Sequence, residues 1–385
     1  MNLIATAMVT SLGYDVHTAC AASRAGLTRA AELPFVVPEN DNSPGLAIGH
    51  PATLLGGGFE GDARLVQLLV GAFRDLAQQL PGDILSSPRL GLYLALPAGD
   101  RERQGLHLVA EDVRALYLER LGRPSQVDDG ARARRILDSA LRMANLPAVR
   151  SAVEGVHVST AGHAGVIELY ESARDDLDSG RLDLALVGGV DSLVGHATLR
   201  WLHSTRRLKS AESPAGLAPG EAAAFVALRR ESLDGRQPDS SRARVDHVVT
   251  RSSKTDFWSG DPADGRTQFQ ILDALRGDST RSAEAHWVIA DQNGEVFRAS
   301  DWGWTLVRLR AAAAKGERVD VWYPPASFGD VGAASGALAT CLAVEALERG
   351  YAPSSRAMLL TNSDSSARAG CLVSSTEASH VSRSR

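Results

Sequence analysis

Four side chains with reactive or hydrogen-bonding chemistry follow strand-like runs or turns: His163, Asp291, Asp330 and Ser159. A histidine can act as a general base or accept an acyl group, and a serine beside it can become a nucleophile. A histidine at a helix start has a lowered proton affinity, because the helix dipole is positive there. We therefore weigh three roles for His163: polar filling or capping, direct catalysis, and ligand contact.

The elements expected to position His163 lie between residues 156 and 187. A short β-rich run meets a small-residue turn, and Gly180 follows the next helical segment where a left-handed C-terminal cap would sit. The apolar run 184–187 then predicts a strand covered on both faces. The buried face of the helix is predicted by an apolar repeat at Val166, Ile167, Tyr170, Ala173 and Leu177.

This segment resembles the nucleophile region of the β-ketoacyl synthases in the thiolase superfamily. GGVDS at residues 188–192 is similar to their GG-x-[DE]-[SA] turn, PGEAA at 219–223 to their GEGA element, and GDVGAASG at 329–336 to their GHxxGAAG loop. VTSLG at residues 9–13 resembles their opening strand, so the resemblance covers nearly the whole chain. It implies an α/β fold that is thiolase-like and pseudo-duplicated, with five layers (α/β/α/β/α). It also implies a homodimer through the strand near residues 156–158.

The catalytic residues of that family are altered at four places. The family's cysteine opens the buried helix, where free N–H groups favour a thiolate, and counting back from Gly180 places His163 there. Asp291 follows the strand where the family has one histidine, and Asp330 replaces the other. NSDSSA at residues 362–367 replaces the closing Gly-rich loop. Because an ionised aspartate only accepts hydrogen bonds, turn capping is the simpler role for both carboxylates.

Three functions stay open from the sequence. The first is a non-catalytic binding or adaptor scaffold; similarity to the ketosynthase-like proteins found with bacterial type VI secretion components implies effector loading. The second is a 3-oxoacyl-ACP synthase-like acyltransferase that uses relocated residues, with His163 and Ser159 as candidates. The third is a chain-length-factor-like partner subunit of an active ketosynthase. Each implies a protein partner: an effector, an acyl carrier protein or a ketosynthase.

Composition excludes several other classes. The chain has 385 residues and a formal charge of −5 with interspersed signs, which argues against nucleic-acid binding. Cys20, Cys341 and Cys371 are too few and too far apart for a disulfide framework and suit a reducing compartment. We see no metal-ligand spacing, cofactor motif, secretory signal or apolar run of the ~20 residues that span a bilayer. We therefore expect a cytoplasmic protein without cofactor or metal.

The chain is expected to divide into two halves. Residues 1–230 form the first, with a helical insertion at about 99–150; residues 243–373 form the second, and 374–385 a disordered tail. Alternating strands and helices predict a mostly parallel sheet. Residues 33–61 are predicted as surface loop with at most one short strand, and Asp62 as a helix N-cap. A solvated or interface patch is predicted for a basic cluster of Arg200, Arg206, Arg207 and Lys209.

Overall fold

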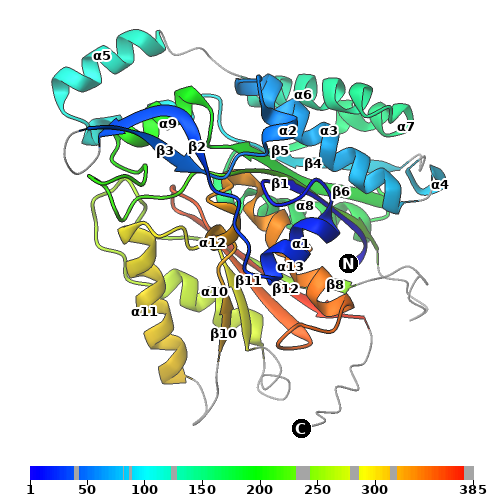
Figure 1. Ribbon diagram of the computed structural model, residues 1–385. Coiled ribbons are helices and arrows are strands. Elements are labelled where there is room, and N and C mark those ends of the chain that lie inside the picture. The colour runs from blue at the N-terminus through cyan, green and yellow to red at the C-terminus, as the bar shows by residue number, and fades with distance from the viewer. Residues whose placement is uncertain are drawn as a thin grey trace.

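A computed structural model of the chain describes residues 1–38, 43–80, 82–85, 89–122, 128–230, 243–277, 286–312 and 319–376. Its main sheet has ten strands in the order β10-β9-β11-β12-β8-β1-β7-β6-β4-β5 (Figure 1). The strands are β1 (Asn2–Thr10), β4 (Leu90–Ala95), β5 (His157–Ser159), β6 (Leu184–Ser192), β7 (Glu221–Arg229), β8 (Ala243–Ser252), β9 (Trp287–Ala290), β10 (Asp320–Trp322), β11 (Arg356–Asn362) and β12 (Ala367–Ser375).

The ten strands form two five-stranded halves with the same internal order. β5-β4-β6-β7-β1 in one half corresponds to β10-β9-β11-β12-β8 in the other, and β1 joins β8 through the pairs Asn2–Arg244 and Leu3–Ala243. In each half the first two pairings are parallel and the last two are antiparallel. The expected duplication is therefore present, whereas the expectation of a mostly parallel sheet is wrong, because the β7 and β12 strands run against their neighbours.

The helices cover both half-sheets in layers (Figure 1). α8 and α13 contact strands of both halves, α3 covers β1, β6 and β7 from outside, and α10 covers β8, β11 and β12 on the other side. This is the five-layer arrangement expected for the thiolase-like fold. The helices are α1 (Val16–Arg24), α2 (Thr53–Gly56), α3 (Gly61–Gln79), α4 (Gly82–Leu85), α5 (Glu111–Leu121), α6 (Asp129–Met143), α7 (Pro147–Arg150), α8 (Gly165–Asp178), α9 (His196–Ser204), α10 (Arg266–Arg276), α11 (Val296–Ala312), α12 (Pro325–Phe328) and α13 (Ser335–Glu348).

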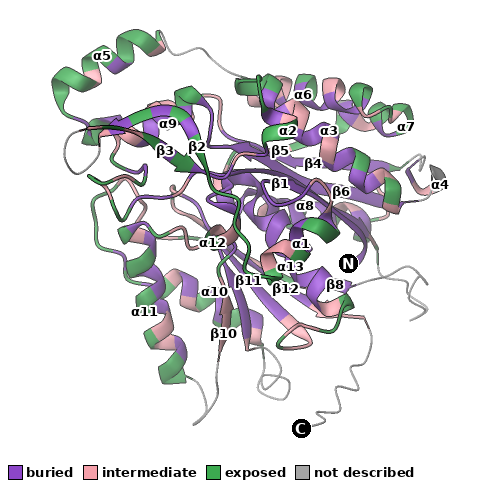
Figure 2. Ribbon diagram, viewed as in Figure 1, coloured by how far each residue is buried: buried purple, intermediate pink, exposed green. Residues whose placement is uncertain are grey.

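The two central helices differ in how much of their surface is buried. Every residue of α13 from Ser335 to Ala346 is buried, as a helix with apolar residues on all sides requires, whereas α8 buries one stripe (Figure 2). Short 3-10 turns precede them, η4 (Gly162–Ala164) before α8 and η6 (Gly332–Ala334) before α13. A Cβ on Gly189 would lie 2.3 Å from the Ala333 carbonyl oxygen, so glycine there lets the η6 turn sit on β6.

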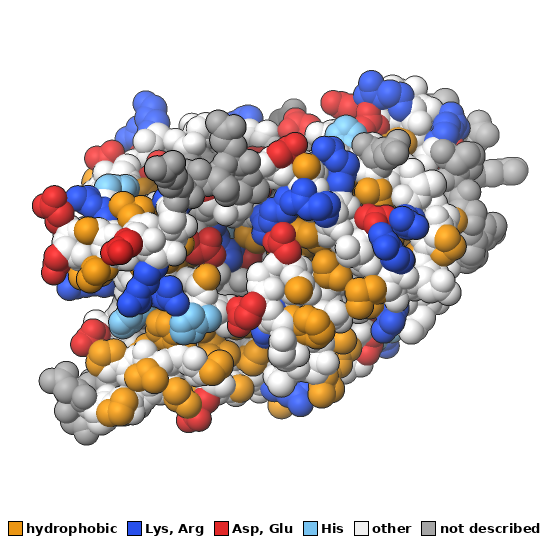
Figure 3. All heavy atoms as spheres, turned by 90° about the horizontal axis from the view of Figure 1, so that it is seen from above, with side chains coloured by type: hydrophobic (Ala, Val, Ile, Leu, Met, Phe, Trp, Pro, Cys, Tyr) orange, Lys and Arg blue, Asp and Glu red, His pale blue; other side chains and the backbone are white. Residues whose placement is uncertain are grey.

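The stretch predicted as surface loop folds differently. β2 (Ala31–Pro38) and β3 (Pro44–Gly49) form a separate two-stranded sheet. Three prolines interrupt these runs and hide the strand pattern, because proline is confined to edge strands and strand ends. One face of the hairpin is buried and β2 contacts α9, and the other face exposes hydrophobic side chains that gather at the surface in Figure 3. The exposed ones include Val36, Leu46 and Ile48.

Several predicted boundaries shift. α3 begins at Gly61 after Glu60, so Asp62 lies in its first turn and is not the N-cap. The predicted insertion contains η1 (Arg101–Arg103), η2 (Leu106–Leu108), α5, α6, α7 and η3 (Ser151–Gly155). β12 extends to Ser375 where the disordered tail was expected, and residues 377–385 lie outside the described ranges, as do linker residues 231–242. Over the described ranges, each helix is too short or too polar to cross a bilayer.

Candidate functional site

The start of α8 is held by a loop from the other half of the chain. Gly162 has φ +71°, which favours glycine, and begins the η4 turn that contains His163. The Ala164 N–H donates to Ser363 Oγ at 3.0 Å, and the Ser363 hydroxyl donates to the Ala161 carbonyl. Ser363 follows β11, so the turn that precedes the central helix is fixed by a residue about two hundred positions away in sequence.

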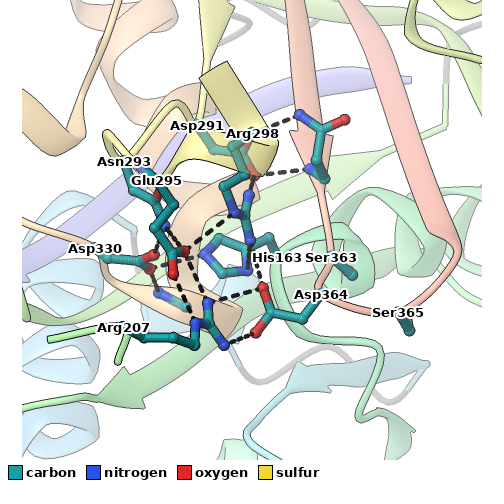
Figure 4. Close-up of polar contacts among 12 residues, drawn as sticks. His163, Arg207, Asp291, Asn293, Glu295, Arg298, Asp330, Ser363, Asp364 and Ser365 are labelled. Atoms are coloured by element: carbon teal, nitrogen blue, oxygen red, sulfur yellow. Dashed lines mark hydrogen bonds and ion pairs between the residues drawn. The ribbon is translucent and has the colours of Figure 1, made fainter. Parts of the chain in front are cut away.

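His163 is buried and both of its ring nitrogens are engaged (Figure 4). Its Nε2 lies 2.8 Å from Asp330 Oδ1, and its Nδ1 lies 3.1 Å from Arg298 Nη2. A guanidinium only donates, so Nδ1 must accept and Nε2–H must donate to Asp330, which assigns the neutral Nε2–H tautomer. Burial, the largest influence, and the charge of Arg298 lower the pKa of His163, but the charge and hydrogen bond of Asp330 together with the charge of Asp291 raise it more, so the net pKa is raised.

Asp330 is the acceptor around which the turn before α13 is built. Its Oδ1 also accepts from the Gly332 N–H at 2.8 Å, and its Oδ2 accepts from Asn293 Nδ2 at 2.6 Å. Burial raises the pKa of Asp330, yet His163 and Arg298 lower it more, so the pKa lies well below its ordinary value. Asp330 is therefore a permanently ionised acceptor and cannot donate to a substrate oxygen.

Two arginines complete the network around His163. Arg207 binds Glu295 through Nε–Oε1 at 2.7 Å and Nη2–Oε2 at 2.8 Å, and Asp364 through Nη1–Oδ2 at 2.6 Å. Arg298 Nη2 lies 3.0 Å from Asp364 Oδ1. Burial raises the pKa of Asp364, but Arg207 and then Arg298 lower it well below the usual range. The two arginines therefore share a carboxylate and join the network into one cluster.

The sequence predicted a solvated or interface patch that includes Arg207, but the structure buries this side chain. Its side chain is 2% exposed, and its guanidinium carbon lies 4.2 Å from the centroid of the Phe257 ring. Two carboxylates and an aromatic face compensate the loss of water, because a buried arginine needs partners for its charge. Neighbouring Arg206 is exposed, in line with the prediction for the cluster.

The structure brings three of the four candidate residues together. Asp291 accepts from the Asn362 N–H at 2.7 Å and from Asn362 Nδ2 at 2.8 Å, and its Oδ2 lies 3.4 Å from Arg298 Nη1. It thus ties β9 to β11 and reaches His163 through Arg298. Ser159 has other partners, the Ala161 N–H at 3.2 Å and a Glu168 oxygen at 3.3 Å, so the pairing with His163 that the acyltransferase alternative left open is not formed.

Five members of the network were not recognised as site residues from the sequence. Arg298 lies in the first turn of α11, which begins at Val296. Glu295 and Arg298 are three residues apart in sequence. This spacing did not point to a buried site, because charged residues three apart on a helix usually face water. The five come from the turn after α9, the segment between β9 and α11, α11 itself and the loop after β11; they are Arg207, Asn293, Glu295, Arg298 and Asp364.

The space next to Asp291 is small. A cavity between Asp291, Pro325, Phe328 and Leu338 has a volume of ≈ 10 Å³, about enough for one water molecule. Among the described residues, no group of three His, Cys, Asp or Glu side chains is arranged to hold a metal ion. The donors in the network, on Arg298, Arg207 and Asn293, are bound to carboxylates or to the imidazole, whereas a condensing enzyme needs donors that face a developing oxyanion.

A second buried ionic cluster lies at the start of β7. Glu221 accepts from Arg64 Nε at 2.6 Å and Arg64 Nη2 at 2.8 Å, from Ser192 Oγ at 2.8 Å and from the Ala52 N–H at 2.7 Å. These contacts join α3, β6 and β7 around the PGEAA segment. Glu221 thus holds secondary-structure elements together.

Comparison with solved structures identifies the fold class of the chain. No protein-family model matches the chain, and no curated protein matches its sequence. A structure described as a type II PKS acyl-carrier protein in complex with its ketosynthase bound to the hexaketide matches with TM-score 0.71 and 14% identity over 98% of this chain and 99% of that one. The oxazolomycin ketosynthase domain of Streptomyces albus matches with TM-score 0.70 and 14% identity, covering 98% of this chain and 74% of its own.

A third match is the ketosynthase ApeO in complex with its chain length factor ApeC from Xenorhabdus doucetiae, with TM-score 0.67, 14% identity and 97% of both chains covered. The protein therefore has the thiolase-like fold of ketosynthases and chain length factors. The fold-class prediction is confirmed.

Proposed function

We propose that this protein is a non-catalytic ketosynthase-like scaffold that binds a partner protein. The observation that supports the proposal is the environment of His163. One ring nitrogen donates to Asp330 and the other accepts from Arg298, so neither lone pair nor proton is free to serve a substrate. A base or acyl acceptor at this position would first have to break a buried ionic network, which is costly because its partners would be left unpaired.

The cysteines support the same proposal. Cys20, Cys341 and Cys371 are each free and buried. Burial raises the pKa of all three thiols, so they stay protonated, and a thiol is a far weaker nucleophile than a thiolate. A condensing reaction needs both a nucleophile and donors for the developing oxyanion, whereas the donors of Arg298 and Asn293 in this network already bind carboxylates.

Intact-mass measurement tests this proposal directly. The full chain is incubated with acetyl, malonyl and octanoyl thioesters of coenzyme A, with an active β-ketoacyl synthase treated in parallel as a positive control. We expect acylation of the control and no mass increase for this chain. An acyl adduct that disappears in His163→Gln would overturn the proposal and favour an acyltransferase with relocated residues.

A chain-length-factor-like subunit is the second candidate. The specific observation in its favour is that similar solved structures include ketosynthases in complex with chain length factors, among them the ishigamide ketosynthase/chain length factor at TM-score 0.65. Under this function the chain would form a heterodimer with an active ketosynthase. Co-expression with a ketosynthase encoded nearby, followed by size-exclusion chromatography, would show a stable one-to-one complex.

The identity of the partner separates the proposals further. The tagged chain can be purified from its native host together with its partners. A chain-length factor should co-purify with a ketosynthase, an acyltransferase with an acyl carrier protein, and a type VI secretion adaptor with a secreted cargo. Self-association through β5 stays a prediction; β5 pairs with β4 and lies at the end of the ten-stranded order. Sedimentation analysis of the purified chain would show whether a homodimer forms.

A further inference from the structure

A cavity of ≈ 340 Å³ lies apart from the network around His163 and shares none of its residues. It opens between α1, the end of β10, the segment that leads into α12, and α13. An engineered cavity of about 150 Å³ holds a benzene molecule, so this one has room for a ring with polar substituents. Its lining residues are Cys20, Ser23, Arg24, Trp322, Tyr323, Pro324, Ser327, Leu342 and Tyr351.

The walls of this cavity are aromatic. The Trp322 and Tyr351 rings are nearly parallel, with an interplanar angle of 14° and centroids 6.2 Å apart. Trp322 is held from behind by Trp287, whose ring centroid is 4.6 Å away, and the Tyr323 hydroxyl accepts from Trp302 Nε1 at 2.8 Å. These contacts fix the rings, so the aromatic surface is rigid before any ligand arrives.

The polar groups of the cavity favour an anion. The Arg24 guanidinium carbon lies 4.2 Å from the Tyr351 ring centroid, and over the described ranges Arg24 makes no ion pair or hydrogen bond. The acidic residue nearby, Glu345, is already bound to Arg349 and His17. Ser23 donates to Ser327 at 3.3 Å, which leaves the Ser327 hydroxyl hydrogen available. A cation held over an aromatic ring, with its donors unused, is suited to a carboxylate.

We propose that this cavity binds a small aromatic carboxylate. The carboxylate would pair with the free donors of Arg24, the ring would lie along Trp322 and Tyr351, and a ring hydroxyl would reach Ser23 or Ser327. Such a site adds a small-molecule ligand to a protein whose proposed role is to bind a partner. It requires no chemistry at His163, so this site and the scaffold role can fail independently.

Isothermal titration calorimetry with 4-hydroxybenzoate tests the proposal, supported by quenching of tryptophan fluorescence. We expect saturable binding with one site per chain. Cyclohexanecarboxylate, which keeps the charge but lacks the ring electrons, should bind about fivefold weaker or worse. Phenol, which lacks the carboxylate, should bind at least about tenfold weaker, because it loses the charge-assisted contact with Arg24.

Two variants locate the site. Arg24→Gln should weaken binding about tenfold to a hundredfold, in line with the loss of hydrogen bonds to a charged group. Arg120→Gln removes an exposed arginine of α5 that does not line the cavity and should leave binding unchanged. Arg24 is exposed, so its variant is expected to fold, which circular dichroism checks. The proposal would be overturned if 4-hydroxybenzoate showed no saturable binding. It would also be overturned if cyclohexanecarboxylate bound equally well, or if Arg24→Gln kept full affinity.

Discussion

Two of the buried ionic clusters among the described residues differ in what they connect. The cluster of Arg64, Glu221 and Ser192 joins one helix to two adjacent strands, and Glu221 lies in the PGEAA segment that resembles the ketosynthase GEGA element. The cluster around His163 joins loops from both halves and includes Asp291 and Asp330. The first cluster therefore fixes neighbouring elements, whereas the second ties the two halves together.

The two clusters also differ in the number of charges they balance. Glu221 pairs with a single arginine and neutral donors, whereas Arg207 alone faces two carboxylates. A buried charge that loses its partner is costly, so a larger cluster has more to lose from one substitution. The stability of the variants below therefore tests whether the network around His163 is a structural core.

The largest effect is expected for Arg207→Met. This change leaves the Glu295 and Asp364 carboxylates buried with fewer partners, and removal of one member of a buried pair typically costs about 3–5 kcal/mol. Urea unfolding monitored by circular dichroism gives the free energy of unfolding. Arg206→Met is the matched control, because the neighbouring side chain is exposed. Equal stability of the two variants would show that the network adds little.

A smaller loss is expected for Glu221→Gln in the other cluster. Glutamine keeps the shape and can still accept from Ser192, but the charge-assisted bonds from Arg64 are lost, which typically cost about 1.5–3 kcal/mol. The same urea experiment measures the loss. Asp183→Asn in the exposed pair with Arg89 is the control and should hardly change the free energy of unfolding. A loss larger than that of Arg207→Met would reverse the comparison between the clusters.

Acid should destabilise the protein through the network around His163. The pKa values of Asp330 and Asp364 are depressed in the folded state, so the unfolded state binds more protons as the pH falls. Their contribution is complete above the ordinary carboxyl value of 3.8 and is lost progressively as pH falls below it. Unfolding free energies between pH 7 and pH 3 should show this loss. Asp330→Asn should flatten the curve below about pH 4, and an unchanged slope would contradict the assignment.

The smallest effect is expected for His163→Gln. A glutamine side chain can donate to Asp330 and accept from Arg298, so the network keeps both contacts and stability should fall by about 1 kcal/mol. Thermal unfolding measures this change. His163→Leu provides the contrast, because it leaves Asp330 and Arg298 unsatisfied and should cost more. If both variants were equally stable, the hydrogen bonds of His163 would not contribute to the fold.

The fold was predictable to a large extent because its signals are local. The helical repeat of α8, the left-handed Gly180 at +71° and the short apolar strands each depend on neighbours in sequence. The hairpin of β2 and β3 was missed because its prolines mask a strand pattern and its outer face is apolar. The antiparallel course of β7 and β12 was also missed, since strand direction is decided by which strands pair.

From the sequence alone, short motifs and their spacing implied the five-layer fold through their resemblance to the ketosynthases, because such motifs depend only on neighbouring residues. Only the tertiary structure decided that Arg207 and Arg298 lie beside His163, and that Ser159 does not. These contacts join residues from distant segments, and long-range partners leave no periodic trace in either segment. These charged side chains pair with one another because a buried charge without an oppositely charged partner is costly.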